Sequence, residues 1–359
     1  MGKLRAGIIG TGIATGISYA HYIGYQKSEC AYVTAVYNRR TESAEAWCRK
    51  YGIEGVKVCR SLEDFFKEVD IVSICTPNDT HVQYIKECLK AGKHVLCEKP
   101  VGAGEEKLAD LEKECRKAGG VQMVDFNYRK IPGIHFLSEI NKQGALGEIV
   151  LYRHTMGAGR LANEMVGFEW RMDRKCSGSG SLGDFGSHIL DTMLFITGKR
   201  PEDICCSQSM EKIQIKERMC NGISRAVEND DCAVVQGVLG KETLFTFFTS
   251  RVGGLGNRLE IIGTKAIASF SMDKPYEVLL EIREPGAGFS GLMKVCTAEG
   301  GEIEKFLTEA PNAMAAACSC NAADFAKHAA ERRDAAASLI YGIRVERVLD
   351  EMDKKAVCL

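Results

Sequence analysis

Residues 4–37 read LRAGIIGTGIATGISYAHYIGYQKSECAYVTAVY. A short apolar run ends at Gly10, a helical stretch follows to about Lys27, and a second apolar run begins at Ala31. This strand, helix, strand order is the repeating unit of doubly wound parallel sheets. Gly10 permits a tight turn after the first strand, and Gly12 lets the backbone approach a pyrophosphate. We therefore expect a dinucleotide site at this turn.

The same alternation of strands and helices continues to about Phe126. The expected strands cover residues 56–58, 71–75, 94–97 and 121–126, and the expected helices cover 41–51, 61–67, 80–91 and 104–117. Such a pattern predicts an α/β fold with a parallel sheet and helices on both faces. We assign residues 1–126 to a dinucleotide-binding Rossmann domain.

The first helix is expected to begin near Ile13 and to present free amides and its positive dipole end to the pyrophosphate. Thr15 departs from the usual third Gly or Ala of the motif and adds bulk where helix and strand pack closely. Gly16 follows and can take that role if the helix begins later.

The second strand ends in Tyr37-Asn38-Arg39-Arg40, where an Asp or Glu would normally hold the ribose diol of NAD. Asn38 can hydrogen-bond a hydroxyl, and the two arginines can neutralise a ribose phosphate or stack on adenine. Alternatively, the arginines open a solvated helix. The pattern favours NADP and leaves NAD open.

Two further strand ends carry polar residues, Thr76-Pro77-Asn78 and Glu98-Lys99-Pro100. Because ligands bind beyond the carboxyl ends of parallel strands, we expect these segments and the glycine turn to meet in one crevice. Beside a nicotinamide cation, desolvation and like charge would depress the pKa of Lys99, which could then pass a proton at neutral pH. A surface loop lysine is the alternative. Glu98 is expected to anchor the loop.

After Phe126 the pattern changes to long alternating segments, so residues 127–359 are expected to form an α+β domain with an open, mostly antiparallel sheet. The expected strands cover 149–156, 204–215, 232–239, 243–249, 258–262 and 266–272, and the expected helical regions cover 131–142 and 312–352. The last helical region is expected to pack back on the chain, in part on the first domain.

Asp184, His188 and Asp191 are spaced i, i+4 and i+7, which places them on one face of a helix. A solvated acidic stripe is one interpretation. The apolar neighbours, however, predict a largely buried helix, in which these charges would need partners. We therefore interpret His188 and Asp184 as functional, and Asp191 as a weaker candidate.

Composition narrows the class of protein. A chain of 359 residues is long enough for two domains, and its formal net charge of -1 gives no reason to expect nucleic acid or an anionic membrane as partner. No apolar stretch reaches the length of a membrane span or a signal peptide, so a cytoplasmic protein is expected. The 16 cysteines are scattered singly and are interpreted as reduced thiols, and their spacing predicts no metal site.

Several motifs together resemble the Gfo/Idh/MocA family of glucose-fructose oxidoreductase and inositol dehydrogenase relatives. They are the glycine-rich turn, Thr76-Pro77-Asn78-Asp79-Thr80-His81, Gly92 to Pro100, Gly147-Glu148-Ile149, and Gly180-x-Leu182-x-Asp184-x-x-x-His188-x-x-Asp191. The resemblance implies a Rossmann domain and a substrate domain whose open sheet often mediates oligomer contacts. Thr15 and Asn38 depart from the family pattern, which leaves the nucleotide preference open.

The resemblance also implies roles for individual residues. His188 would be the acid or base on the reacting hydroxyl, Asp184 would orient substrate and histidine, and Lys99 would assist proton transfer and hold a hydroxyl. The expected cofactor contacts are Gly10, Gly12, Ile13, Asn38, Arg39, Thr76, Asn78, His81, Glu98 and Lys99. Further candidates for substrate contact are Tyr128, Trp170 and Arg171, with Arg129 beside them.

Three functions are compatible with these residues. The first is an NAD(P)-dependent oxidoreductase that moves a hydride between nicotinamide and a secondary hydroxyl or ketone of a sugar, glycoside or polyol. The second is a redox-neutral enzyme that retains its nucleotide and oxidises a sugar transiently, commonly at its third carbon, to permit glycoside cleavage or hydride exchange. The third is a non-catalytic nucleotide-binding regulator. A small-molecule substrate and a homo-oligomer formed through the C-terminal sheet are the expected partners.

Overall fold

The computed structural model describes residues 2–13, 16–102, 104–254, 256–284, 286–298 and 301–358. The chain forms two compact units. Unit 1 comprises Met1–Lys130 and Glu302–Ile343, and unit 2 comprises Ile131–Gly301 and Arg344–Leu359. The segment 302–343 thus belongs with the nucleotide-binding half of the chain, although it follows the second half in sequence.

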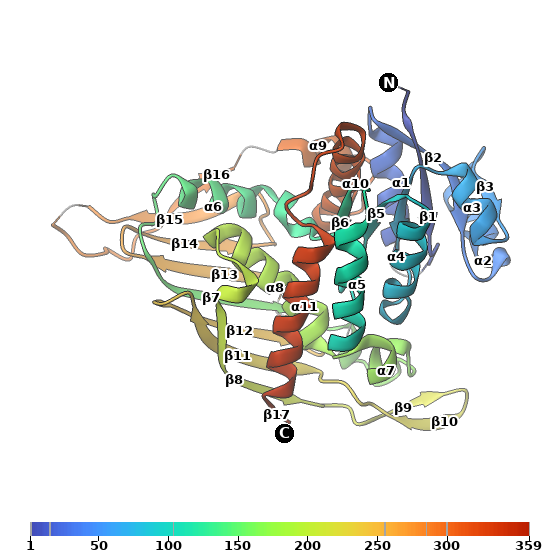
Figure 1. The fold of residues 1–359 in the computed structure, drawn as a ribbon. Coiled ribbons are helices and arrows are strands. Elements are labelled where there is room, and N and C mark those ends of the chain that lie inside the picture. The colour runs from blue at the N-terminus through green and yellow to red at the C-terminus, as the bar shows by residue number, and fades with distance from the viewer. Residues whose placement is uncertain are drawn as a thin grey trace. The chain divides into compact units, whose positions relative to one another are not determined.

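Unit 1 contains a six-stranded parallel sheet in the order β3-β2-β1-β4-β5-β6 (Figure 1). This order, with a crossover between β1 and β4, confirms the predicted Rossmann fold. The strands are β1 (Leu4–Ile9), β2 (Ala31–Tyr37), β3 (Lys57–Cys59), β4 (Ile71–Ile74), β5 (His94–Cys97) and β6 (Gln122–Val124). The helices are α1 (Ile17–Lys27), α2 (Thr41–Tyr51), α3 (Leu62–Glu68), η1 (Asn78–Thr80), α4 (His81–Lys90), α5 (Glu105–Lys117), η2 (Asn127–Lys130), α9 (Glu304–Leu307) and α10 (Ala313–Glu331).

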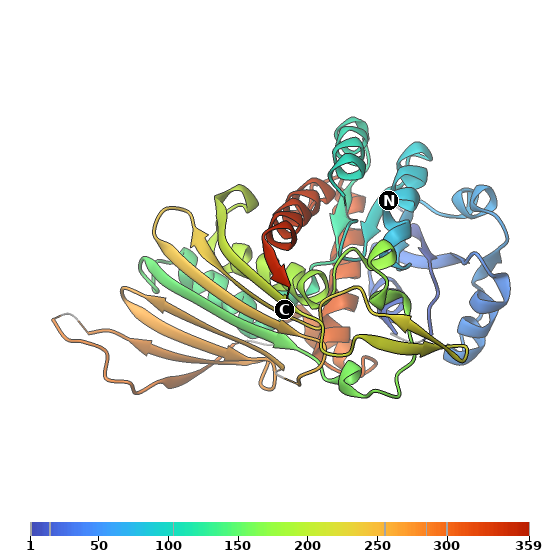
Figure 2. The same cartoon turned by 90° about the horizontal axis from the view of Figure 1, so that it is seen from below.

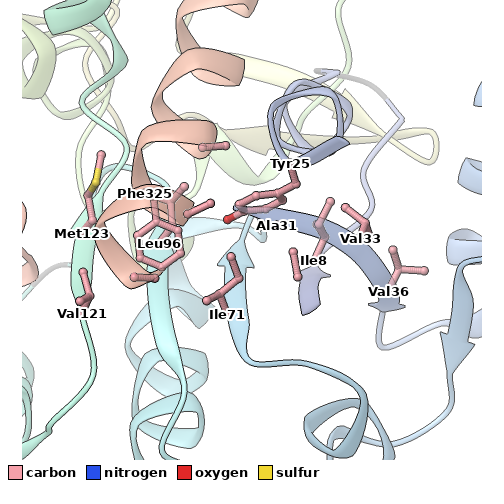
Figure 3. Close-up of a cluster of buried hydrophobic side chains, with 14 of the residues drawn as sticks. Ile8, Tyr25, Ala31, Val33, Val36, Ile71, Leu96, Val121, Met123 and Phe325 are labelled. Carbon is pink, nitrogen blue, oxygen red and sulfur yellow. The ribbon is translucent and has the colours of Figure 1, made fainter. Parts of the chain in front are cut away.

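Helices cover both faces of this sheet. A Cβ added at Gly7 of β1 would lie 2.4 Å from the ring of Phe65 in α3. The next residue, Ile8, points the other way, into a fully buried cluster with Tyr25 of α1 and Phe325 of α10 (Figure 3). Successive strand residues face opposite sides, so α3 lies on one face and α1 and α10 lie on the other.

Helix α10 comes from the far end of the chain and packs closely against α1. A Cβ at Gly24 of α1 would lie 2.3 Å from the carbonyl oxygen of Ser319, so a larger residue cannot fit at this crossing. The hydroxyl of Ser319 donates to the carbonyl of Ala20 over 2.7 Å. The predicted last helical region therefore completes one face of the nucleotide-binding sheet.

Unit 2 is built on a nine-stranded sheet in the order β16-β15-β14-β13-β7-β12-β11-β8-β17. The sheet is mostly antiparallel, as predicted, but β7 pairs with β12 and β8 with β17 in parallel. Its strands are β7 (Ile149–Gly157), β8 (Ile204–Lys212), β11 (Cys232–Leu239), β12 (Thr243–Ser250), β13 (Gly256–Gly263), β14 (Ala266–Ser271), β15 (Glu277–Ile282), β16 (Lys294–Thr297) and β17 (Ala356–Cys358). A separate hairpin consists of β9 (Glu217–Cys220) and β10 (Ile223–Ala226).

Helices cover one face of this sheet (Figure 2). Phe247 of β12 faces α8, because its ring would lie 3.8 Å from a Cβ at Gly186. Leu244 and Phe248, which have the other parity, therefore lie on the opposite face, and Leu244 is exposed. The helices of unit 2 are η3 (Arg160–Ala162), η4 (Trp170–Met172), η5 (Pro201–Asp203), α6 (Pro132–Lys142), α7 (Arg174–Ser177) and α8 (Ser181–Thr197). Helices α11 (Leu339–Lys354) and η6 (Gly301–Ile303) each include residues of both units.

Some predicted elements differ from the structure. The final helical region is two helices, α10 and α11, because Arg332 adopts a left-handed conformation with φ 52° and ends the first of them. The predicted strand 204–215 ends at Lys212, and the short strands β9, β10, β15, β16 and β17 were missed. Short strands contain too few residues to show an alternating pattern, and they form because they pair with neighbouring strands.

Two global properties follow from the sequence and the described residues. All 16 cysteines are free thiols in the structure. Among the helices of the described ranges, none is long and apolar enough to cross a membrane.

Candidate active site

The two glycines of the turn after β1 have different surroundings: Gly10 packs against other residues of the fold, and Gly12 borders open space. Gly10 has φ 92°, and a Cβ there would lie 2.6 Å from Thr76 Cγ2 and 2.8 Å from the backbone of Cys75. Gly10 thus allows the ends of β1 and β4 to approach. A Cβ at Gly12, by contrast, would meet no described atom within 4 Å. The open space beside Gly12 fits the close approach of a dinucleotide phosphate.

Helix α1 begins at Ile17, and the prediction of a start near Ile13 was wrong. Gly16 precedes the helix with φ 71°, a left-handed conformation that glycine adopts readily. Ile13 lies in a turn and is 39% exposed. Thr15 lies outside the described residues. The free amides of the first helical turn therefore follow Gly16.

The end of β2 has no carboxylate from Tyr37 to Arg40. Asn38 closes the glycine turn, because its Nδ2 donates to Thr11 Oγ1 over 3.2 Å and its Oδ1 accepts from the Arg40 amide over 3.3 Å. The side chains of Arg39 and Arg40 are exposed. This edge thus offers an amide and two cations to the adenosine half of a nucleotide.

The loops after β4 and β5 are joined by a buried histidine. The ring of His81 lies 2.7 Å from the Pro100 carbonyl through Nδ1 and 2.8 Å from the Thr76 carbonyl through Nε2. Burial lowers the pKa of His81, so the ring is neutral at pH 7 and its single N–H donates to one of the two carbonyls. Thr80 also contacts Thr76, with their hydroxyl oxygens 2.8 Å apart. His81 thus hydrogen-bonds one loop and lies against the other, and its predicted contact with the cofactor stays a prediction.

The other residues predicted here lie at the same edge. Asn78 begins the short helix η1, Glu98 directly follows β5, and half-buried Lys99 precedes Pro100 with a cis peptide bond. Tyr128 is buried in η2, and Arg129 lies with its Cζ 4.9 Å from the ring centroid of Tyr341. These residues of unit 1 therefore follow the carboxyl ends of its strands, and their role in a site stays a prediction.

Three ionisable groups form a buried cluster in unit 1, which we name the His21 cluster: His21, Glu98 and Asp125. Nε2 of His21 lies 2.9 Å from Glu98 Oε1 and 3.1 Å from Asp125 Oδ2. Its Nδ1 lies 2.9 Å from Ser73 Oγ, and Asn321 Nδ2 donates to Asp125 Oδ1 over 2.6 Å. Glu98 does anchor its loop, as expected, but it does so through a histidine that sequence reasoning missed.

The electrostatics of the cluster favour a protonated His21. Burial alone would lower the pKa of His21, but contacts with Cys75, Asp125 and Glu98 raise it well above its ordinary value. Because burial keeps Cys75 a neutral thiol at pH 7, the two carboxyl groups carry this effect there. Burial and the Asp125 charge raise the pKa of Glu98 to about 7. Burial acts in the same direction on Asp125, yet the hydrogen bond and charge of His21 bring the pKa of Asp125 below its ordinary value. At neutral pH, an imidazolium therefore faces one carboxylate and one titrating carboxyl.

Unit 2 places the second group of predicted residues on helix α8. Asp184, His188 and Asp191 all lie within this one helix, as the spacing predicted. His188 is 8% exposed, Asp191 is 1% exposed, and Asp184 is half-buried. The apolar neighbours thus predicted burial correctly. Of the three side chains, Asp184 is the most accessible and Asp191 is enclosed.

The start of α8 is held by Asp230, which sequence reasoning also missed. Its Oδ1 accepts from the Gly180 amide over 2.6 Å, and its Oδ2 accepts from the Ser181 hydroxyl over 2.6 Å and the Leu182 amide over 2.9 Å. The guanidinium of Arg251 donates to the Asp230 carbonyl over 2.8 Å. A carboxylate that caps free amides stabilises a helix start. Asp230 therefore positions the helix that carries Asp184 and His188.

Trp170 and Arg171 lie together in η4 of the same unit. The Arg171 Cζ is 4.4 Å from the Trp170 ring centroid, a cation–π contact. The Arg171 carbonyl accepts from Asn229 Nδ2 over 3.0 Å and from Arg251 Nη1 over 2.9 Å. Arg251 thus connects this short helix to the capping residue of α8. Asp230 and Arg251 could have been noticed in the sequence as charged residues next to apolar strands, Asp230 before β11 and Arg251 after β12.

Two family models match this chain. The model described as an oxidoreductase family with an NAD-binding Rossmann fold matches residues 4–126, and the GFO/IDH/MocA C-terminal domain matches residues 134–269. Fold and matched sequence together define a two-domain oxidoreductase-type protein with an NAD-binding Rossmann domain. The chain belongs to the Gfo/Idh/MocA family, which confirms the resemblance noted from its motifs.

Several curated relatives are dehydrogenases of sugars or polyols. Levoglucosan dehydrogenase of Pseudarthrobacter phenanthrenivorans is 28% identical over 55% of this chain and 52% of its own length. D-glucoside 3-dehydrogenase of Escherichia coli is 31% identical over 58% of each chain. Inositol 2-dehydrogenase of Rhizobium meliloti is 25% identical over 85% of this chain and 88% of its own. The chain thus spans little more than half the length of the first two.

Solved structures share the whole fold. Levoglucosan dehydrogenase in complex with NADH and levoglucosan matches with a TM-score of 0.86 at 22% identity, covering 99% of this chain and 97% of that chain. An inositol dehydrogenase homolog complexed with NAD+ from Azotobacter vinelandii matches with a TM-score of 0.80 at 20% identity, covering 99% and 96%. At these identities, the likeness establishes the architecture.

Proposed function

We propose that this protein is an NAD(P)-dependent oxidoreductase acting on a secondary hydroxyl or ketone of a sugar, glycoside or polyol. The observation that carries the proposal is the pairing of two features in one chain of this family. One is a Rossmann edge with an open glycine turn and Lys99, and the other is a helix with His188 and Asp184. Relatives named as dehydrogenases of levoglucosan, D-glucoside and inositol support this substrate class.

Each of the three polar groups has a role in the proposal. His188 takes the proton from the reacting hydroxyl or returns it, and Lys99 assists this transfer and holds a hydroxyl. Asp184 orients the substrate and His188. The nicotinamide ring, when bound, supplies the hydride acceptor or donor. Proton transfer by a positioned group is worth about a hundredfold to ten-thousandfold in rate.

The proposal is tested by incubating the purified protein with NAD or NADP and a panel of sugars, glycosides and polyols. The expected result is that at least one compound of the panel causes reduction of the nucleotide, which is monitored by the absorbance of the reduced form. Copurified nucleotide and turnover without net absorbance change would favour the redox-neutral alternative. Nucleotide binding with no turnover on any compound would favour the non-catalytic regulator.

We further propose that Arg39 lets the site accept NADP beside NAD. Arg39 is exposed at the end of β2, and a guanidinium can pair with a ribose phosphate in two hydrogen bonds. Arg39→Ala should weaken NADP binding about tenfold and NAD binding much less, because only NADP carries that phosphate. Fluorescence titration measures both affinities. Arg49→Ala, at an exposed site on α2, is the control, and equal losses for both nucleotides would contradict this assignment.

We also propose that the sheet face opposite α8 mediates self-association. On this face, the strand register places Leu244 of β12, which is 55% exposed, in one row with Leu151 of β7, Ile262 of β13 and Ile267 of β14. A contiguous apolar patch on a surface is typical of an interaction site. Light scattering on the purified chain is expected to give a mass above that of one copy. A mass of one chain at assay concentration would contradict this proposal.

A further inference from the structure

The His21 cluster lies at the edge of the sheet where a nucleotide is expected. Glu98 follows β5, and its amide donates to the carbonyl of Ile74 in β4 over 3.0 Å. Asp125 follows β6, and its amide donates to the carbonyl of Cys97 over 2.8 Å. His21 comes from α1, the helix that follows the glycine turn. Ligands of open parallel sheets bind outside these carboxyl ends, so the cluster lies next to the expected nucleotide site.

Only one member of the cluster reaches the surface. The side chains of His21 and Asp125 are 0% exposed, whereas that of Glu98 is 14% exposed. A proton held by the three groups can therefore exchange with solvent through Glu98. A charge bound at this edge acts most strongly on Glu98, because coulombic energy falls with distance and Glu98 is the member of the cluster that reaches the surface.

The charge of the cluster depends on a single proton. With Glu98 protonated, the imidazolium and the Asp125 carboxylate balance each other, and with Glu98 ionised the cluster carries one net negative charge. Burial raises the pKa of four further titratable groups near the cluster, so these groups stay neutral at pH 7. They are Tyr25 on α1, Cys75 after β4, Cys97 on β5 and Cys318 on α10. Lys99, a further cationic residue at this edge of the sheet, follows Glu98 in sequence.

We propose that the His21 cluster is a proton site coupled to the charge of the bound nicotinamide ring: Glu98 releases its proton when the oxidised, cationic nucleotide binds and keeps it when the reduced, neutral nucleotide binds. This inference rests on the nucleotide binding of the proposed function. In this binding reaction, the protein with protonated Glu98 and the oxidised nucleotide give the complex and one free proton. No bond of the nucleotide changes in this step.

The titration of Glu98 falls in the range where such coupling is observable. Because the pKa of Glu98 is raised to about 7, its protonated and ionised forms are both populated at neutral pH. A nearby cation lowers the pKa of a carboxyl, and a neutral ring does not. The affinity for the oxidised nucleotide should therefore rise as the pH rises toward 7, by up to about tenfold per pH unit, and level off above it. The affinity for the reduced nucleotide should stay flat.

His21 sets the pH at which the exchange occurs. Its imidazolium hydrogen-bonds Glu98 and lowers the pKa of that carboxyl against the effect of burial. Replacing His21 with glutamine removes the charge and keeps a polar side chain. The proton release of a folded His21→Gln variant should therefore move to higher pH. A purely structural role of His21 would leave this pH unchanged.

The test is calorimetric titration of the full-length protein with NAD+ and with NADH, each in two buffers of different ionisation enthalpy at pH about 7. For each nucleotide, the difference in heat between the two buffers gives the number of protons released. The two nucleotides differ only at the nicotinamide ring, so the difference between them gives the protons released in response to the charge of this ring. We expect release of a substantial fraction of one proton with NAD+ and none with NADH. Equal release with both nucleotides, or none with NAD+, would overturn the proposal.

Two variants assign the proton to Glu98. Glu98→Gln, which cannot ionise, should bind both nucleotides without proton release, and Glu63→Gln, at an exposed site on α3, should behave as the parent protein. Proton release that persists in Glu98→Gln would contradict the assignment. If binding and proton release occur but no sugar or polyol is turned over, the proposed function fails and this inference stands. Absence of any nucleotide binding would overturn both.

Discussion

His188→Ala is expected to lower turnover about a hundredfold to ten-thousandfold, while nucleotide affinity stays within about twofold. The imidazole is the proposed proton acceptor for the reacting hydroxyl, and alanine offers no replacement for it. His188 lies on α8 in unit 2, whereas the residues expected to hold the nucleotide lie in unit 1. Steady-state rates and fluorescence titration of the nucleotide separate the two effects.

A matched control is His135→Ala, because His135 is an exposed histidine on α6 of the same unit. Its turnover should equal that of the parent protein. Unchanged turnover of His188→Ala would show that another group handles the proton. A parallel loss of nucleotide binding would point to a general structural defect, which the melting temperature of the variant detects.

The second large effect is expected for Asp230→Ala, which should reduce the free energy of unfolding by about 3 kcal/mol. The buried carboxylate accepts from Gly180, Ser181 and Leu182, and alanine would leave three buried donors without it. Turnover should fall as well, because the start of α8 positions Asp184. Denaturant unfolding measures the stability, and kcat measures the consequence for the site.

Ser61→Ala tests whether burial causes the size of this effect. Ser61 caps α3 with one bond to the Asp64 amide, and this bond is exposed, so its loss should reduce the free energy of unfolding by only about 1 kcal/mol. Asp230→Asn keeps one acceptor oxygen, so its loss in free energy of unfolding should lie between those of Asp230→Ala and Ser61→Ala. Equal losses for Asp230→Ala and Ser61→Ala would contradict the role assigned to Asp230.

Most of unit 1 was predictable from local sequence. Strands such as Ile71–Ile74 and His94–Cys97 are buried on both faces, so they appear as short continuous apolar runs between helical segments. The start of α1 was not predictable in this way. It depends on the left-handed conformation of Gly16, which the sequence permits at several glycines of the same stretch.

Unit 2 was less predictable because its sheet is assembled from distant segments. The parallel neighbours β7 and β12 place Leu151 opposite Leu244, and the last strand joins the edge at β8. Alternation of polar and apolar residues shows that a segment is a strand with two unlike faces, but it does not show which strand lies beside it. The expected antiparallel sheet was therefore correct in type and incomplete in order.

For the candidate site, spacing within one element was enough where a helix carried the residues. Asp184, His188 and Asp191 share α8 because a helical repeat is a local property. The residues that support the site could not be found in this way. His21 meets Asp125 across 104 positions of the chain, and Asp230 meets Leu182 across 48.

By itself, the sequence determined the two kinds of fold, the glycine turn and the helix that carries the proposed proton-transfer groups. These features depend on backbone conformation and on periodic burial, which neighbouring residues set. Only the tertiary structure decided that a histidine shares its proton between two carboxyl groups and that Asp230 caps α8. Hydrogen bonds and buried charges depend on distances between atoms, and residues far apart in sequence acquire such distances only when the chain folds.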